Sequence, residues 1–165
     1  MIKDIMQAAS IKLNNPMEAR ILLAHATGYS QEYLIGHSDE NLSTKTLNKF
    51  YELIERRIKK EPIAYIVGYR EFYGRNFFVD ENVLIPRSDS EVLIEAVLST
   101  TKNDGLNILD LGVGSGCLIL TLLLEMPNAK AISADISNKA LEVAIKNMLQ
   151  YNLENRCKLK ISNWF

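Results

Sequence analysis

Residues that build metal centres and disulfide frameworks are scarce in this sequence. It has two cysteines and two histidines in 165 residues, and no group of them has the spacing of metal ligands. Cys117 and Cys157 both lie in segments with the pattern of protein core, which indicates free thiols. The sequence therefore predicts no metal site and fits a reducing compartment.

A strong net charge and a long apolar run are absent as well. The formal net charge is −1, so no overall electrostatic attraction draws the chain to nucleic acid or to an anionic membrane. The first residues, MIKDIMQAASIKLNNP, do not have the basic start and apolar core of a signal peptide. The longest apolar run, Cys117 to Leu124, is far shorter than the roughly 20 residues of a membrane span. We expect a cytoplasmic protein with no membrane partner and no direct nucleic-acid partner.

The first sixty residues predict a small helical bundle. Asn15 and Pro16 are a typical N-cap and first helical residue, and Met17, Ile21 and Ala24 follow at helical spacing. A second helix begins near Ser43 and carries an apolar face of Leu47, Phe50, Ile54 and Ile58. The basic cluster RRIKK, Arg56 to Lys60, is either a nucleic-acid contact or a solvated helix end whose cations complement the helix dipole; we favour the second interpretation.

The rest of the chain changes pattern twice. Pro62 ends the helix, and IAYIVGYREFYGRNFFVD alternates around two glycines as a β-hairpin does. From Ser88, which has capping-box spacing to Glu91, helices alternate with the strands NILDL, AKAISADI and CKLKI. The last helix, SNKALEVAIKNMLQYN, carries an apolar face of Leu141, Ala144, Ile145 and Met148. This alternation predicts an α/β domain with a parallel sheet, in which NILDL has the apolar character of a central strand and CKLKI that of an edge strand.

A glycine-rich turn, LDLGVGSGC, joins the first of these strands to the next helix. Gly112, Gly114 and Gly116 permit a tight turn and close approach of a ligand, and free N–H groups at the helix start would offer hydrogen-bond donors. A dinucleotide fingerprint would place the third glycine one residue later, and a phosphate loop would continue with Gly-Lys. The spacing therefore disfavours both of these sites.

Asp135 ends the second strand of the sheet, where a carboxylate can accept hydrogen bonds from the two hydroxyls of a ribose. This position is shared by nicotinamide and S-adenosylmethionine sites, and Asp135 also precedes Ser137, a probable helix N-cap. We favour a nucleoside cofactor over a purely structural turn. The pattern D-x-G-x-G-x-G, starting at Asp110, resembles the first motif of class I S-adenosylmethionine-dependent methyltransferases with a Rossmann-like sheet.

A second resemblance covers most of the chain. Residues 61–95 resemble the linker and entry helix of the HemK/PrmC-type glutamine methyltransferases, whose pattern runs P-x-x-Y-x-x-G, then E-F, then I-P-R-P-D-T-E. The matching residues, in order, are Pro62, Tyr65, Gly68, Glu71, Phe72, Ile85, Pro86, Arg87, Asp89 and Glu91. The terminal SNWF is similar to the family's S-D-W-F, and the N-terminal helices resemble those of the family. Ser88 and Ser90 depart from the pattern.

The resemblance implies a function and a domain organisation. Members of this family use S-adenosylmethionine to methylate the side-chain amide of the glutamine in the Gly-Gly-Gln motif of class I peptide chain release factors. The implied parts are a helical substrate-recognition domain at 1–60, a β-hairpin linker at 61–84 and the first half of a methyltransferase domain at 85–165. The implied cofactor residues are Asp110, Gly112, Val113, Gly114, Gly116, Asp135, Ile136, Asn163 and Trp164. The implied substrate-pocket residues are Phe72, Pro86 and Arg87.

The family's catalytic motif N-P-P-Y is missing from this sequence. The Asn15-Pro16 pair is followed by Met17 and begins a helix, so we assign no catalytic residue. We expect the 165 residues alone to be an incomplete, inactive fragment, with the strand at 108–111 as an open edge that favours aggregation or dimerisation. Two alternatives remain, a nucleic-acid amino-methyltransferase and a non-catalytic truncated remnant; the linker motif and the absence of a basic face disfavour the first.

Overall fold

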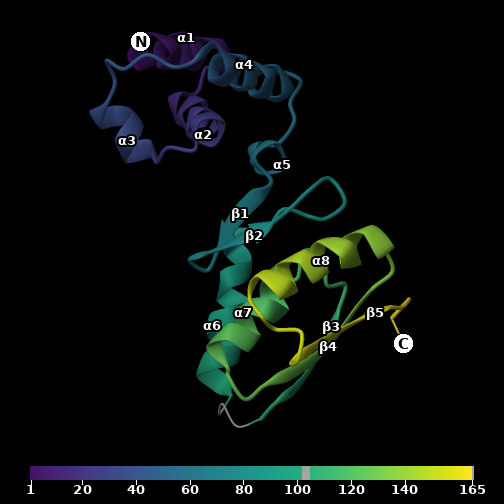
Figure 1. Cartoon of the computed structure of the whole chain (residues 1–165). Helices are drawn as coiled ribbons and strands as arrows, with labels where there is room; N and C mark the ends of the chain where they lie inside the picture. The colour runs from purple at the N-terminus through teal and green to yellow at the C-terminus, as the bar shows by residue number, and fades with distance from the viewer. Residues whose placement is uncertain (102–104, 165) are drawn as a thin grey trace. The chain divides into compact units, whose positions relative to one another are not determined.

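The computed structural model describes residues 1–101 and 105–164, and Phe165, the end of the SNWF match, lies outside them. The chain divides into two compact units, Met1–Val67 and Gly68–Phe165 (Figure 1). In the described residues, no helix has both the length and the apolar character needed to cross a membrane.

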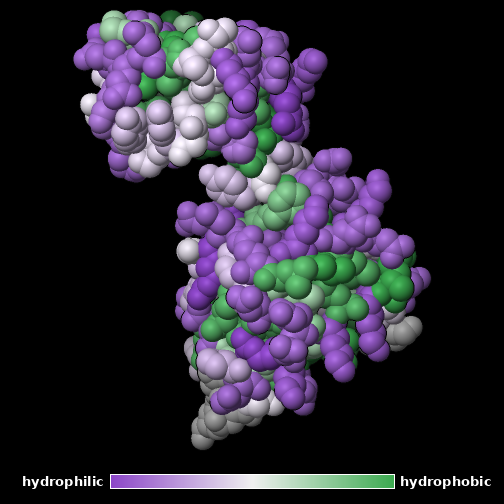
Figure 2. All heavy atoms as spheres, viewed as in Figure 1, coloured by the Kyte–Doolittle hydropathy of each residue, from purple (hydrophilic) through white to green (hydrophobic). Residues whose placement is uncertain are grey.

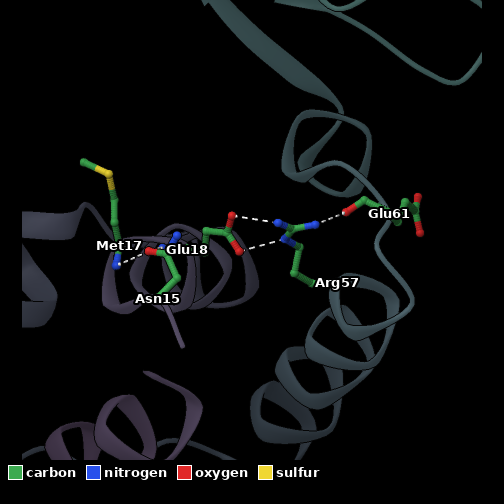
Figure 3. Close-up of polar contacts among 5 residues, drawn as sticks. All are labelled: Asn15, Met17, Glu18, Arg57 and Glu61. Atoms are coloured by element: carbon green, nitrogen blue, oxygen red, sulfur yellow. Dashed lines mark hydrogen bonds and ion pairs between the residues drawn. The ribbon is translucent and has the colours of Figure 1, made fainter. Parts of the chain in front are cut away.

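The first unit is a helical bundle, as the sequence predicts. Its helices are α1 (Ile2–Leu13), α2 (Pro16–Thr27), α3 (Gln31–Gly36), α4 (Thr44–Ile58) and α5 (Ile63–Val67). Asn15 caps α2, because its side-chain oxygen accepts hydrogen bonds from the N–H groups of Met17 (3.1 Å) and Glu18 (3.2 Å) (Figure 3). Ser43 caps α4 in the same manner, through the N–H of Thr46. Both predicted helix starts are confirmed.

Of the apolar residues at helical spacing in α2, Ile21 and Ala24 pack against the bundle core but Met17 does not. Met17 is exposed, and the residues buried in the bundle core are Ala19, Leu22 and Leu23. This helix has apolar residues on more than one side, so spacing alone does not identify its core face. Packing against the neighbouring helices buries the side that carries the two adjacent leucines.

The two arginines of the basic cluster take part in contacts within the first unit. Arg57 donates two hydrogen bonds to the carboxylate of Glu18 (2.7 and 2.9 Å) and one to the main-chain oxygen of Glu61 (3.2 Å) (Figure 3). Arg56 forms an ion pair with the Glu61 side chain. These contacts join α2, α4 and the segment before α5, and they support the structural interpretation of the cluster.

The second unit begins with a β-hairpin. Strands β1 (Tyr69–Phe72) and β2 (Arg75–Phe78) pair antiparallel around the two-residue turn Tyr73-Gly74, in which both residues have positive φ, as the common tight hairpin turns require. The predicted hairpin was too long at its start, because residues 63–67 form helix α5. Pro62 begins that helix by accepting hydrogen bonds from the next turn at its carbonyl, and Gly68 ends it.

A three-stranded parallel sheet follows, which confirms the α/β class. After a 3-10 turn (Ser88–Ser90) come α6 (Glu91–Thr100), β3 (Asn107–Leu111), α7 (Cys117–Glu125), β4 (Lys130–Asp135), α8 (Asn138–Gln150) and β5 (Cys157–Ile161). The strand order is β3-β4-β5, with both pairs parallel. Figure 1 shows the three helices on one side of the sheet, where their apolar side chains form the core of this unit.

The other face of the sheet carries no helix in the described residues. Cross-strand neighbours Leu109, Ile132 and Lys158 lie in register on this face, and they line a shallow hollow of about 430 Å³. Strand β3 pairs with β4 alone among the described strands, so the expected open edge is confirmed. Figure 2 shows a further band of hydrophobic surface in the region of α8 and β5, whose exposed apolar side chains include Ile145 and Ile161.

The predicted capping box at the start of α6 is wrong. Ser88 lies in the 3-10 turn, and Ser90, the residue before α6, makes no side-chain capping bond. The Glu91 carboxylate instead accepts a hydrogen bond from the N–H of Tyr73 (3.0 Å). This contact attaches the turn of the hairpin to α6, a tertiary role that the local spacing of Ser88 and Glu91 does not reveal.

Candidate functional site

The glycine turn Gly112–Gly116 is attached to the sheet by hydrogen bonds that its N–H groups donate. Gly112 and Val113 donate to the main-chain oxygen of Ala134 (2.8 and 2.9 Å), and Gly116 donates to that of Val113 (2.8 Å). These donors are therefore not available to a ligand, and the expectation of free N–H groups is wrong for them. A tight turn that satisfies its own donors is unsuited to hold a phosphate group, in agreement with the glycine spacing.

Asp135 connects the turn to the next helix. Its carboxylate accepts the N–H of Gly114 at one oxygen (3.0 Å) and the N–H of Ser137 at the other (2.9 Å). Ser137 in turn caps α8 through the N–H of Ala140 (3.2 Å). A carboxylate has about four lone-pair sites, so two remain for a ligand. Asp135 therefore serves the local fold and still has acceptor capacity for ribose hydroxyls.

A hollow of about 170 Å³ lies at the carboxyl ends of the three strands. It is lined by Leu111, Gly112, Ala134, Asp135, Ile136, Ser162, Asn163 and Trp164, which include five of the nine residues predicted for the cofactor. Ile136 and Trp164 on its border are 69% and 67% exposed, so they offer apolar surface that a flat aromatic group can cover. The hollow is smaller than the roughly 300 Å³ of common ligand pockets, so it can receive one part of a nucleoside cofactor.

The other predicted cofactor residues lie outside this hollow. Val113 is buried, Gly114 reaches Asp135 through its N–H, and Gly116 begins α7. Asp110 lines a separate hollow of about 240 Å³ between β3 and the helices α6 and α7. The predicted cofactor residues therefore lie in one region at the strand ends, but those that line a hollow are divided between two separate hollows.

The predicted substrate-pocket residues lie in different environments. Phe72 is 1% exposed and packs edge-on against Phe77 in the core, so it offers no surface to a substrate in this structure. Pro86 is buried and Arg87 is exposed, and neither lines the hollows described above. The assignment of Phe72 to the pocket followed from the family resemblance, and the burial of Phe72 agrees instead with a packing role for an aromatic residue in a hairpin.

Asp110 is a carboxylate in apolar surroundings. Desolvation by burial and, to a smaller degree, the charge of Asp135 raise the pKa of Asp110 above its usual value. The other residues that line its hollow are apolar, and no Lys or Arg is among them. A cation bound in this region would stabilise the charged form of Asp110 and offset the free-energy cost of its desolvation.

Replacing Asp110 with asparagine is expected to stabilise the protein at pH 7. The folded state binds the Asp110 proton more tightly than the unfolded chain does, so wild-type stability falls as pH rises from about 3.9 through the raised pKa. Asp110→Asn removes that loss. Thermal unfolding between pH 3 and pH 8 measures the effect, with the exposed Glu154→Gln as control. A variant less stable than wild type at pH 7 would show that Asp110 has a compensating partner.

The burial of Asn147 was not predicted from the sequence. Asn147 on α8 is fully buried, whereas Ile145, assigned to the apolar face, is 39% exposed. The rest of that assignment placed Leu141 and Ala144 correctly in the core. Asn147 bonds to the hairpin and to the glycine turn, as described further below.

Comparison with known proteins identifies two domains. The model of the PrmC N-terminal domain matches residues 7–68, and a methyltransferase domain model matches residues 102–165. The release factor glutamine methyltransferase of Neisseria gonorrhoeae is 42% identical over 149 residues, which cover 90% of this chain and 54% of that protein. The corresponding enzyme of Aliivibrio fischeri is 38% identical, with 90% and 52% covered.

A bifunctional methyltransferase of Rickettsia prowazekii is similar over a longer stretch. It is 41% identical over 189 residues, which cover 99% of this chain and 36% of that protein. The chain therefore spans between 36% and 54% of the length of these three relatives.

Proposed function

The chain belongs to the PrmC family of protein-glutamine methyltransferases, and we propose that it supplies the cofactor-binding part of a site that methylates the glutamine side-chain amide of class I peptide chain release factors. The observation that carries the proposal is the hollow at the ends of the parallel strands, where Asp135 retains acceptor capacity between the exposed apolar Ile136 and Trp164. The similarity to release factor glutamine methyltransferases supports the substrate class.

The cofactor in this proposal is S-adenosylmethionine, and the described residues fit it. Asp135 would accept the ribose hydroxyls, Ile136 and Trp164 would cover the adenine, and the Asn163 amide oxygen would accept the adenine amino group. Asp110 is the partly buried carboxylate that a cationic cofactor would stabilise, and S-adenosylmethionine carries both a sulfonium and an ammonium group. When bound, the cofactor supplies an electrophilic methyl group.

The substrate side of the proposal is divided between the two units. We assign recognition of the release factor to the helical residues 1–60 and place Pro86 and Arg87 at the mouth of the site. A glutamine amide is a weak nucleophile, because its nitrogen lone pair is delocalised into the carbonyl. It therefore needs acceptors for its two N–H groups and an in-line methyl donor. In this family N-P-P-Y provides such acceptors, and the 165 residues lack that motif.

Isothermal titration calorimetry with S-adenosylmethionine tests the proposal. Asp135→Ala is expected to weaken binding at least about tenfold, because hydrogen bonds to a charged group contribute roughly 1.5–3 kcal/mol. Glu154→Ala, which removes an exposed carboxylate before β5, is the matched control and is expected to bind like the wild type. NAD is expected to bind more weakly than S-adenosylmethionine. No binding by the wild type, or equal binding by Asp135→Ala, would contradict the assignment.

A further inference from the structure

Asn147 has a buried side-chain amide whose oxygen and nitrogen both form hydrogen bonds. The side-chain oxygen accepts the N–H of Phe78 at 2.7 Å. The side-chain nitrogen donates to the main-chain oxygens of Phe78 at 2.9 Å and of Ser115 at 2.8 Å. With 0% exposure, Asn147 has no water to replace these partners. Loss of the amide would leave the buried Ser115 carbonyl and two part-buried main-chain groups of Phe78 without this partner.

These three bonds connect segments that are far apart in the sequence. Phe78 is the last residue of β2, Ser115 lies inside the glycine turn, and Asn147 is on α8. The N–H groups of Gly112, Val113 and Gly114 connect the turn to β4. The Asn147 amide thus holds the turn on its opposite side, and the same amide fixes the end of the hairpin.

Two more contacts attach the hairpin to the end of α8, away from the glycine turn. The side chains of Gln150 and Tyr151 both donate to the main-chain oxygen of Asn76, at 2.8 and 2.6 Å. They hold the hairpin on α8 but do not reach the turn. Asn147 differs from them because one side chain bonds to both the hairpin and the turn.

We propose that Asn147 is a positioning residue that couples the hairpin to the cofactor turn, so that cofactor binding at the strand ends and order in the hairpin strengthen each other. The inference rests on the proposed function, because it takes S-adenosylmethionine as the ligand at the turn. Cofactor binding that orders the turn also orders the Ser115 carbonyl. The Asn147 amide donates to that carbonyl and is held with it, and Phe78, which bonds to the same amide, is held in turn. By thermodynamic reciprocity, a hairpin fixed by other contacts would raise the affinity for the cofactor.

Amide hydrogen exchange of the wild-type chain tests the coupling without any substitution. Saturating S-adenosylmethionine is expected to slow exchange at Phe78 and at Val79, whose N–H bonds to Gly68 at the base of the hairpin, by about fivefold or more. Slowing confined to residues 112–116 and 135–137 would overturn the proposal.

Asn147→Ser tests the residue itself, because serine is too short to reach all three partners. The variant is expected to bind S-adenosylmethionine at least about fivefold more weakly, and exchange at Val79 should no longer respond to the ligand. Gln150→Ala removes a hairpin contact that does not involve the turn. Because Tyr151 still donates to the same Asn76 oxygen and keeps the hairpin on α8, wild-type affinity and the wild-type Val79 response are expected.

The outcomes separate this inference from the proposed function. A wild type that does not bind S-adenosylmethionine overturns the proposed function and this inference with it. A wild type that binds, combined with an Asn147→Ser variant of wild-type affinity, overturns the coupling alone. If Asn147→Ser does not fold, the wild-type exchange measurement decides.

Discussion

Gly116→Ala is expected to destabilise the second unit by about 2–4 kcal/mol, the sum of left-handed backbone strain and overpacking. Gly116 has a φ of +79°, which residues with a Cβ atom rarely adopt. An added Cβ would lie 3.0 Å from Cδ1 of Leu120 and 3.3 Å from its Cγ. Leu120 is buried in the core, so it cannot move away without disturbing its neighbours. The same displacement would shift the start of α7 and weaken cofactor binding.

Gly74→Ala is the matched control for this substitution. Gly74 has a similar φ of +70° in the same unit, but an added Cβ there would meet nothing within 4 Å. The control is therefore expected to lose only about 1–2 kcal/mol from backbone strain. Urea unfolding of the full chain, followed by circular dichroism and by the fluorescence of the single tryptophan, measures both. Equal losses in the two variants would show that Leu120 adapts to the added methyl group.

Local sequence pattern was sufficient to predict the α/β class and the position of the turn. Helix caps at Asn15 and Ser43 depend on neighbours two or three residues away, so their signal is contained in the sequence. The parallel sheet followed from strands that alternate with helices. CKLKI lies at an edge as predicted, whereas NILDL, which has the apolar character of a central strand, forms the other edge of the described sheet. The predicted residues around Asp135 converge because parallel strands end at one edge of the sheet.

The features that could not be predicted depend on contacts between distant segments. Glu91 has the spacing of a capping residue, yet it bonds to Tyr73 on the hairpin. The N–H groups of the glycine turn look free from the local pattern, yet the neighbouring strand and Asp135 use several of them. A buried asparagine such as Asn147 is indistinguishable in sequence from a solvent-exposed one, because its partners lie 32 and 69 residues away.

Contacts among the hairpin, the glycine turn and the neighbouring elements fix the position of the proposed cofactor region in the second unit. Asp135 orients Gly114, Asn147 holds Ser115, and Glu91 fastens the hairpin turn. Each contact is a hydrogen bond between a side chain and the main chain, which fixes backbone position without adding to the surface that a ligand meets. A glutamine substrate, however, needs acceptors in addition to a held cofactor.

The 165-residue chain is expected to bind S-adenosylmethionine and to transfer no measurable methyl group to a release factor. Neither acidic residue of the site is assigned to the glutamine amide, because the remaining acceptor capacity of Asp135 is assigned to the ribose and Asp110 lies among apolar side chains. The sequence holds no N-P-P-Y to accept the glutamine N–H groups. A poorly aligned amide without acceptors loses both the orientation and the electrostatic contributions to catalysis, which together reduce a rate by many orders of magnitude.

Mass spectrometry of the Gly-Gly-Gln peptide from a purified release factor measures this transfer directly. The factor is incubated with the cofactor and either the 165-residue chain or the Neisseria gonorrhoeae release factor glutamine methyltransferase, which serves as the positive control. We expect the mass increment of one methyl group in the control alone. The expected lack of methyl transfer results from the missing acceptors and not from a failure to bind the cofactor. The assay is therefore run under conditions where calorimetry shows binding. Methylated glutamine produced by the 165-residue chain would mean that its own residues supply the acceptors. The exposed carboxylate of Asp89 and the main-chain carbonyls along the open edge of β3 would then be the first places to search for them.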